Sequence, residues 1–256
     1  MKILALGDIV GTRSIEYLQK NLWKLRSRLG VDFVVANGEN ASEIRGLSAK
    51  DATALLDCGI DVITLGNHAF GKRDIYSMLD DSDRIVRPAN YPPETPGNGY
   101  TILSADGWKL LCINVSGCAL LDPLACPFET VDKILARERD NYDLALLDIH
   151  AEATSEKLAL AHYFDGRIQI MFGTHTHVPT ADEKVLPKGS GYITDLGMCG
   201  PENSIIGTDI QTVIHRFKTH LPAHFTVADG PIVANGALFD VDTFTKRVKS
   251  VCRIVF

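Results

Sequence analysis

Three successive apolar runs near the start of the chain each end in a glycine followed by polar residues. The three endings are Gly7-Asp8, Gly38-Glu39-Asn40 and Gly66-Asn67-His68. Between the first two runs, leucine and isoleucine recur at helical spacing over residues 15–29. Strand-length runs that alternate with helical segments are typical of α/β folds with a parallel sheet. The sequence therefore predicts an α/β protein whose strands deliver polar side chains at their ends.

The alternation continues to the end of the chain. We expect further strands over residues 108–115, 144–149, 168–172 and 192–196, and helices over residues 48–58, 129–139 and 209–218. Ser48 is predicted to cap one helix, and Thr154 to begin another as its cap. Residues 225–256 predict β-structure with turns at Asp229-Gly230 and Asn235-Gly236. Proline and asparagine over residues 86–100 favour an ordered loop covering a site.

Histidines follow the later apolar runs. His150 ends one run, and Gly173-Thr174-His175-Thr176-His177 follows another. Taken singly, a Gly-Asp pair is usually a turn and a lone histidine is usually packed in the core. Ligands of open α/β sheets bind where loops leave the carboxyl ends of strands, so we expect these ends to converge. The polar set comprises Asp8, Glu39, Asn40, Asn67, His150, His175 and His177.

This set of oxygen and imidazole donors predicts a metal site. Without thiolates it suits Fe or Mn, with Zn as the alternative, and not a structural cysteine-rich zinc centre. A catalytic zinc ion normally takes three protein ligands, so six or seven donors fit two divalent metal ions with a bridging carboxylate. Such a pair activates a shared water for hydrolytic phosphoryl chemistry.

Length and composition limit the class of protein. A chain of 256 residues with 45% hydrophobic and 23% charged residues suits one soluble domain over residues 1–256. No run approaches the length of a membrane span, so we expect a cytoplasmic protein with no membrane partner. The six cysteines form no C-x-x-C pair and are expected to be reduced. A net charge of −6 argues against a broad nucleic-acid surface but allows a nucleotide or a short RNA.

The ordered blocks also carry a family resemblance. Gly7-Asp8, Gly38-Glu39-Asn40, Gly66-Asn67-His68, His150-Ala151-Glu152 and the segment from Gly173 to His177 are similar to the motifs of the calcineurin-like metallophosphoesterases. Arg87-Pro88-Ala89-Asn90 and Leu186-Pro187-Lys188-Gly189 resemble the YmdB-like subfamily, and the similarity runs nearly end to end. The resemblance implies a four-layer α/β/β/α metallophosphoesterase sandwich with metals at the carboxyl ends of the strands.

The resemblance also implies a role for each site residue. One metal ion would be held by Asp8, Asn40 and His177, the other by Asn67, His150 and His175, with Glu39 bridging. His68, next to Asn67, would act as the general acid that protonates the leaving oxygen.

The expected enzyme is a metal-dependent phosphoric diester hydrolase that acts on small cyclic phosphodiesters. Its first candidate substrates are 2′,3′-cyclic nucleotides. In this hypothesis a metal-bound hydroxide attacks phosphorus. Two alternatives remain open: the same catalyst acting on RNA ends or phosphomonoesters, and a regulatory protein with a non-catalytic metal centre. We expect a homo-oligomer, although no heptad pattern indicates its state.

The chain departs from the family pattern at several positions. Val10 stands where the wider superfamily has a ligand histidine, and Asn40 is the candidate replacement donor. Phe70-Gly71 replaces a Trp-Asp pair, which leaves Asp74 as the nearest acid that could orient His68. Ile15 and Cys118 stand where relatives tend to carry arginine, and Arg13 is the candidate substitute for the first. These changes bear on substrate affinity and leave the metal chemistry intact.

Overall fold

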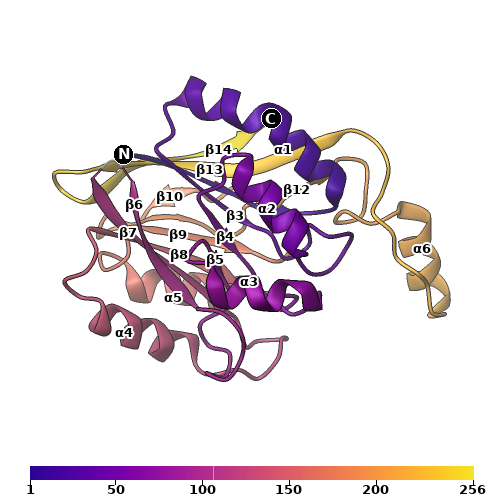
Figure 1. Ribbon diagram of the computed structural model, residues 1–256, viewed down its shortest axis with the longest axis horizontal. Coiled ribbons are helices and arrows are strands. Elements are labelled where there is room, and N and C mark those ends of the chain that lie inside the picture. The colour runs from indigo at the N-terminus through magenta and orange to yellow at the C-terminus, as the bar shows by residue number, and fades with distance from the viewer. Residues whose placement is uncertain (106) are drawn as a thin grey trace.

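The computed structural model describes residues 1–105 and 107–256, whose strands form two mixed sheets (Figure 1). The first sheet contains, in spatial order, β2 (Asp8–Ile9), β12 (Met198–Pro201), β13 (Ile232–Asp242), β1 (Lys2–Leu6), β3 (Phe33–Asn37), β4 (Val62–Thr64) and β5 (Ile85–Val86), with β14 (Arg247–Val255) paired to β13. The second contains β10 (Lys184–Val185), β11 (Gly191–Ile193), β9 (Ile170–Thr174), β8 (Leu144–His150), β7 (Trp108–Ser116) and β6 (Tyr100–Ala105). The predicted mixed α/β class is confirmed.

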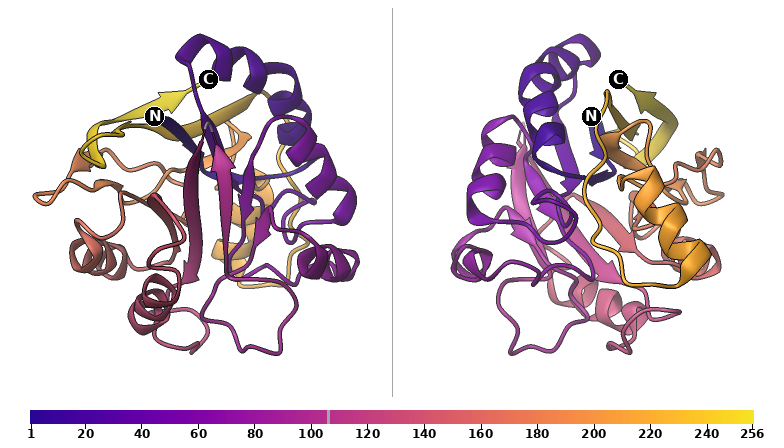
Figure 2. Two further views of the ribbon diagram at one scale, coloured as in Figure 1. Left: turned by 60° about the vertical axis from the view of Figure 1, so that its left-hand side comes forward. Right: turned by 90° about the vertical axis from the view of Figure 1, so that its right-hand side faces the viewer.

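Helices lie outside the sheets, as the two views of Figure 2 show. They are α1 (Thr12–Leu29), α2 (Ala49–Asp57), α3 (Tyr76–Asp81), α4 (Pro127–Arg137), α5 (Thr154–Phe164), α6 (Ile210–Thr219) and the short 3-10 helix η1 (Arg73–Ile75). Within the described ranges, no helix combines the length and apolar character needed to cross a membrane.

The core has three apolar parts. One lies between the sheets, where Phe33 and Phe239 of the first sheet pack with Leu146 and Phe172 of the second. The rings of Phe172 and Phe239 are 6.4 Å apart between centroids. A second part joins α1 and α2 to the outer face of the first sheet, and a third joins α4 and α5 to the outer face of the second. Each sheet is thus buried on both faces, as the long apolar strands require.

The parallel strands explain how distant segments meet. In the first sheet β1, β3, β4 and β5 are parallel, and in the second β7, β8, β9 and β11 are parallel. Parallel strands present all their carboxyl ends at one edge, where loops can gather side chains into a single site. Loops from both sheets can therefore contribute to the same site.

Most predicted elements are present, with shifted ends. Ser48 caps α2 as predicted, and its side chain accepts a hydrogen bond from the Asp51 amide. The Thr154 prediction is wrong in detail, because Ala153 is the N-cap of α5 and makes no side-chain hydrogen bond. The turn predicted at Asn235-Gly236 is also wrong. Both residues lie inside β13, where Gly236 passes so close to β1 that a Cβ atom would lie 2.3 Å from the Ala5 carbonyl oxygen.

Replacing Phe172 by alanine should lower the free energy of unfolding by about 3–5 kcal/mol, because it leaves a cavity between the sheets. The side chain is 0% exposed. Phe244→Ala is the matched control, because Phe244 is 96% exposed and should change stability little. Chemical denaturation measures the free energy of unfolding of both variants. Equal losses of stability would contradict the assignment of Phe172 to the core between the sheets.

Candidate metal centre

The seven predicted ligands lie at the ends of strands from both sheets. Asp8 begins β2, Glu39 and Asn40 follow β3, Asn67 follows β4, His150 ends β8, and His175 and His177 follow β9. Their side chains fall into two groups, one around His150 and one around His177.

One group surrounds the inner nitrogen of His150. Its Nε2 lies 3.0 Å from Glu39 Oε1, 3.0 Å from Asn67 Oδ1 and 3.1 Å from His175 Nδ1. One ligand atom from each of Glu39, His150 and His175 falls within 4.8 Å of the others. Four atoms with lone pairs therefore converge on one point, as a cation requires.

The other group surrounds His177. Its Nε2 lies 3.5 Å from Asp8 Oδ1 and 3.2 Å from Asn40 Nδ2. The two groups are joined because the backbone N–H of His175 donates to Asp8 Oδ2 at 3.1 Å. Burial lowers the pKa of His177, but Asp8 outweighs it and raises that pKa, with a smaller contribution from Glu39. The Glu39 carboxylate itself contacts the His68 amide at 2.7 Å and His150 Nε2 at 3.0 Å.

Each histidine donates its outer N–H away from the centre. His177 Nδ1 donates to the Ile206 carbonyl oxygen at 2.9 Å, and His175 Nε2 lies 3.1 Å from Glu152 Oε2. His150 Nδ1 lies 2.9 Å from Thr174 Oγ1, whose hydroxyl donates to Asp148 Oδ1 at 2.8 Å. Because the Thr174 proton is used in that way, its oxygen accepts from His150. All three rings thus turn their other nitrogen inward, as metal-bound histidines do.

A glycine keeps the His150 ring in place. A Cβ atom at Gly66 would lie 2.2 Å from the ring, so only glycine fits there without moving His150. Gly66 immediately precedes the ligand Asn67. The backbone between β4 and Asn67 can therefore pass directly against the imidazole.

A buried ion pair holds the loop that carries His175 and His177. Lys157 Nζ of α5 lies 2.8 Å from Asp195 Oδ2, and both side chains are at most 1% exposed. The same Asp195 oxygen accepts from the amide and the hydroxyl of Thr176, at 3.2 and 2.8 Å. His175 and His177 have φ of 95° and 64°, which is the left-handed region that L-residues rarely occupy. Through Thr176, the middle residue of this loop, Asp195 holds the strained backbone of His175 and His177 in place.

The site is built to stabilise positive charge. Burial raises the pKa of Asp8 and of Glu39, yet His177 and His150 respectively hold these values below their ordinary ranges. Burial lowers the pKa of His150, but the Glu39 carboxylate outweighs it and raises that pKa to about 9. Burial and the nearby His150 lower the pKa of His175 to about 4. The two buried carboxylates thus favour positive charge at this position, which a metal ion bound to neutral imidazoles would supply in place of a proton.

These residues fit divalent metal ions. Asp8 Oδ1 is buried and has no hydrogen-bond partner among the described residues, which is costly for a carboxylate oxygen without a cation. The converging donors are carboxylate, amide and imidazole atoms, a set that suits Mn, Fe or Zn. Cysteine takes no part, and the six cysteines are free as predicted.

His68 lies at the edge of the centre. Its backbone N–H donates to Glu39 Oε2 at 2.7 Å, and its ring Nδ1 is 3.5 Å from Asn67 Nδ2. Burial lowers the pKa of this ring, Glu39 raises it, and Arg45 lowers it further. The ring is half-buried, so one edge of it can meet a ligand.

Two secondary expectations differ from the structure. Asp74 does not orient His68, because its carboxylate accepts from the Ala49 amide at 3.1 Å, near the start of α2. Arg13 pairs with Asp229 at 3.3 Å and donates to the Gly230 carbonyl oxygen at 2.7 Å. Phe70 packs edge-on against Tyr91, which brings the predicted loop over residues 86–100 to the segment that follows His68.

The residues that orient the ligands were not predicted. Thr174, Glu152, Lys157 and Asp195 come from separate segments, and no spacing in the sequence links them to the histidines. The one usable signal was the oxygen side chain of Thr174 directly before His175. A lysine in a helix normally faces solvent, so Lys157 gave no signal in the sequence.

The chain is similar to proteins of known family. A family model for YmdB-like proteins matches residues 4–254. A 2′,3′-cyclic-nucleotide 2′-phosphodiesterase of Bacillus subtilis is 45% identical over 255 residues, which cover 100% of this chain and 97% of that protein.

Two solved structures superpose closely. A hypothetical protein from Thermus thermophilus has a TM-score of 0.94 at 41% identity, over 100% of this chain and 99% of the other. A phosphatase from Mycoplasma pneumoniae also has a TM-score of 0.94, at 35% identity, over 100% and 93%.

Lys157→Met should lower the free energy of unfolding by about 3–5 kcal/mol, because it leaves Asp195 charged and unpaired in the interior. Adding Asp195→Asn should restore part of that loss by removing the buried charge. Lys133→Met, on the exposed face of α4, is the matched control and should change stability little. Denaturant titration measures the free energy of unfolding of all three variants. A loss for Lys157→Met as small as that for Lys133→Met would contradict the buried ion pair.

Proposed function

Since the chain belongs to the YmdB-like protein family and is a phosphoric diester hydrolase, we propose that it hydrolyses small cyclic phosphodiesters, with 2′,3′-cyclic nucleotides as the first candidates. The substrate named for the Bacillus subtilis relative supports this choice, because the similarity covers the whole chain. The observation that carries the proposal is the inward orientation of three imidazoles around two buried carboxylates.

In this proposal the site holds two divalent metal ions. Asp8, Asn40 and His177 would hold one, Asn67, His150 and His175 would hold the other, and Glu39 would be shared between them. When bound, the ions lower the pKa of a water molecule and neutralise charge on the phosphoryl oxygens. The protein contributes ligand orientation, because the outer hydrogen bonds of the three histidines fix which ring nitrogen faces inward. Iron and manganese suit the donors first, and zinc is the alternative.

The reaction is a hydrolysis that opens the cyclic diester. The oxygen of water forms a bond to phosphorus, and one bond from phosphorus to a ribose oxygen breaks. That ribose oxygen takes a proton and becomes a hydroxyl, which leaves a nucleotide monoester. We assign the proton to His68, whose place next to Asn67 and Glu39 puts its ring beside the reacting group. The negative charge of a bound substrate raises the pKa of the ring and favours its protonated form.

Further expectations stay predictions. We assign the two sheets and their outer helices to the four-layer α/β/β/α order of metallophosphoesterases, which the three apolar parts of the core support. A single domain over residues 1–256, assembly into a homo-oligomer and a cytoplasmic location belong to the same proposal.

Turnover of 2′,3′-cyclic AMP by protein grown with Mn and Fe should be lost on chelation and restored by adding metal back. Elemental analysis should find close to two metal ions per chain. Glu39→Gln should reduce the bound metal, because it weakens the bridge between the two groups. Stoichiometric metal without turnover of any phosphodiester would favour the regulatory alternative, and turnover that survives complete removal of metal would overturn the proposal.

His68→Ala should lower kcat on 2′,3′-cyclic AMP by about 10²–10⁴-fold, the usual contribution of a positioned general acid. The loss should be much smaller on bis(4-nitrophenyl) phosphate, because nitrophenolate leaves without a proton. The ratio of the two losses is the measurement, since a merely structural defect would slow both substrates alike. Unchanged turnover of the cyclic nucleotide would show that His68 is not the acid.

A further inference from the structure

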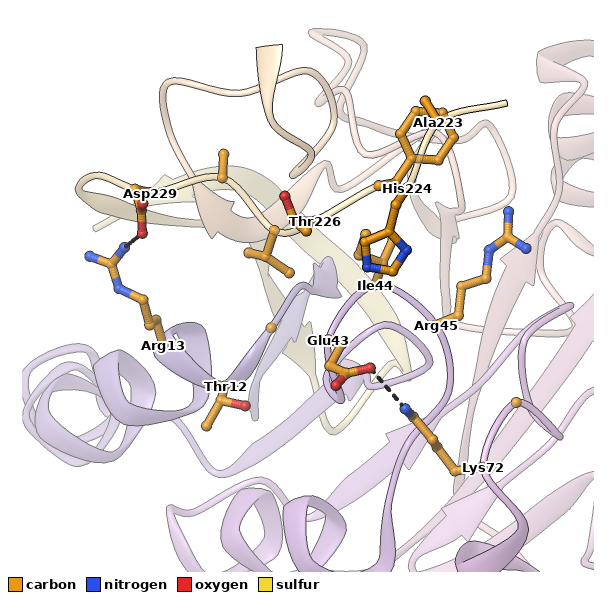
Figure 3. A pocket seen from close by; sticks show the side chains of 15 residues that line it. Thr12, Arg13, Glu43, Ile44, Arg45, Lys72, Ala223, His224, Thr226 and Asp229 are labelled. Carbon is orange, nitrogen blue, oxygen red and sulfur yellow. Dashed lines mark hydrogen bonds and ion pairs between the residues drawn. The ribbon is translucent and has the colours of Figure 1, made fainter. Parts of the chain in front are cut away.

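A pocket of about 860 Å³ (Figure 3) is lined in part by Glu43 and Gly71, which lie three residues beyond Asn40 and His68 in the chain. Its lining combines basic side chains with an imidazole and an aromatic ring, from Arg13, Arg45, Lys72, His224 and Phe225. The volume lies near the upper end of the ~300–1,000 Å³ typical of small-molecule sites. The pocket can therefore hold more than a single phosphate group.

Hydrogen bonds tie the walls of this pocket to the proposed ligand loops. Gly11 N–H donates to the Asn40 carbonyl oxygen at 3.0 Å, and Gly71 N–H donates to the His68 carbonyl oxygen at 2.9 Å. On the opposite wall, Ala228 N–H donates to the Gly207 carbonyl oxygen at 3.0 Å, next to the Ile206 oxygen that accepts from His177. The walls of the pocket are thus attached to the loops that carry Asn40, His68 and the acceptor of His177.

The charges of the pocket favour an anion at one end. Lys72 pairs with Glu43 at 3.1 Å and Arg13 pairs with Asp229, whereas Arg45 has no ion pair among the described residues. Figure 3 draws Arg13 and Asp229 at one end and Arg45 with His224 at the other. Arg45 lies five residues beyond Asn40 in the chain and is therefore free to bind a phosphate on this side of the pocket.

Other parts of the pocket lining suit the aromatic base of a nucleotide. Phe225 is 37% exposed, so part of its ring surface is open to a ligand. Ile44 and Val227 add apolar surface, and Thr12 and Thr226 add hydroxyl groups. Gly11 caps α1 without a side chain, and no acid lies in the first turn, so the positive end of this helix dipole also faces the pocket. Single-stranded nucleic acid is bound by this combination of a stacking ring and cations.

We propose that this pocket binds the nucleotide that precedes a terminal 2′,3′-cyclic phosphate, so that the preferred substrate is a short RNA end and not a free cyclic mononucleotide. The inference rests on the proposed function, because the cyclic phosphate itself must lie on the metal centre. Arg45 and His224 contact the phosphate that links the last two nucleotides, and Phe225 stacks on the preceding base. Because the chain has a net charge of −6, we expect its contact with RNA to extend over only a few nucleotides.

The test compares 2′,3′-cyclic AMP with the dinucleotide ApA carrying a 2′,3′-cyclic phosphate, using the metal-loaded full-length protein. We expect kcat/KM to be about tenfold or more higher for the dinucleotide, because stacking or one charge-assisted hydrogen bond contributes that much. The gain should appear mainly in KM and should shrink as salt is added.

Arg45→Ala should lower the ratio of the two kcat/KM values about tenfold, and His224→Ala should lower it in the same direction. Arg28→Ala is the matched control, because Arg28 lies in the last turn of α1, far from the first-turn residues that line the pocket, and removes the same charge. Circular dichroism should show all three variants folded, since Arg45 and His224 are exposed.

The outcomes separate this inference from the proposed function. Turnover of both substrates at equal kcat/KM would overturn the pocket assignment and leave the proposed function standing. An unchanged ratio in Arg45→Ala would also overturn it. Turnover of neither substrate by metal-loaded protein would instead reject the proposed function.

Discussion

Two carboxylates, Asp8 and Glu39, are buried where the carboxyl ends of two sheets meet, and the surrounding structure compensates their charge. A carboxylate without a cation is among the most costly groups to bury. Imidazoles face both of them, and Asp8 still has one oxygen without a hydrogen-bond partner among the described residues. The fold places negative charge in the interior, where a bound cation would complete the balance. Stability and function are therefore coupled at the same atoms.

The orientation of the ligands comes from outside the centre. Each histidine is held by one oxygen on its outer side, and these oxygens belong to a carbonyl, a hydroxyl and a carboxylate from different loops. The pair of Lys157 and Asp195 adds a charged support beneath the strained backbone of His175 and His177. Of the three outer supports of the histidines, only Thr174 is buried, whereas Glu152 is 48% exposed, so the orientation of His150 is the most firmly fixed.

The sequence indicated which residues meet at the centre better than it indicated the residues that support them. Polar residues after apolar runs are local signals, and parallel strands place such ends at one edge, so Asp8, Glu39 and His150 could be grouped without coordinates. Lys157 and Asp195 could not, because their partnership spans distant segments and a lysine in a helix normally faces solvent. The turn signal at Asn235-Gly236 failed because close approach to β1, and not reversal of the chain, requires that glycine.

The segment that carries α6 leaves and rejoins the body of the protein at nearly the same point. Thr208 bridges to Val227, and the Asp209 amide donates to the Thr226 carbonyl oxygen at 3.1 Å, while Figure 1 shows α6 standing apart from both sheets. A segment whose two ends are joined to each other can be replaced as a unit. Transferring this segment from a relative would change one wall of the pocket and leave the strands that carry the proposed ligands unchanged.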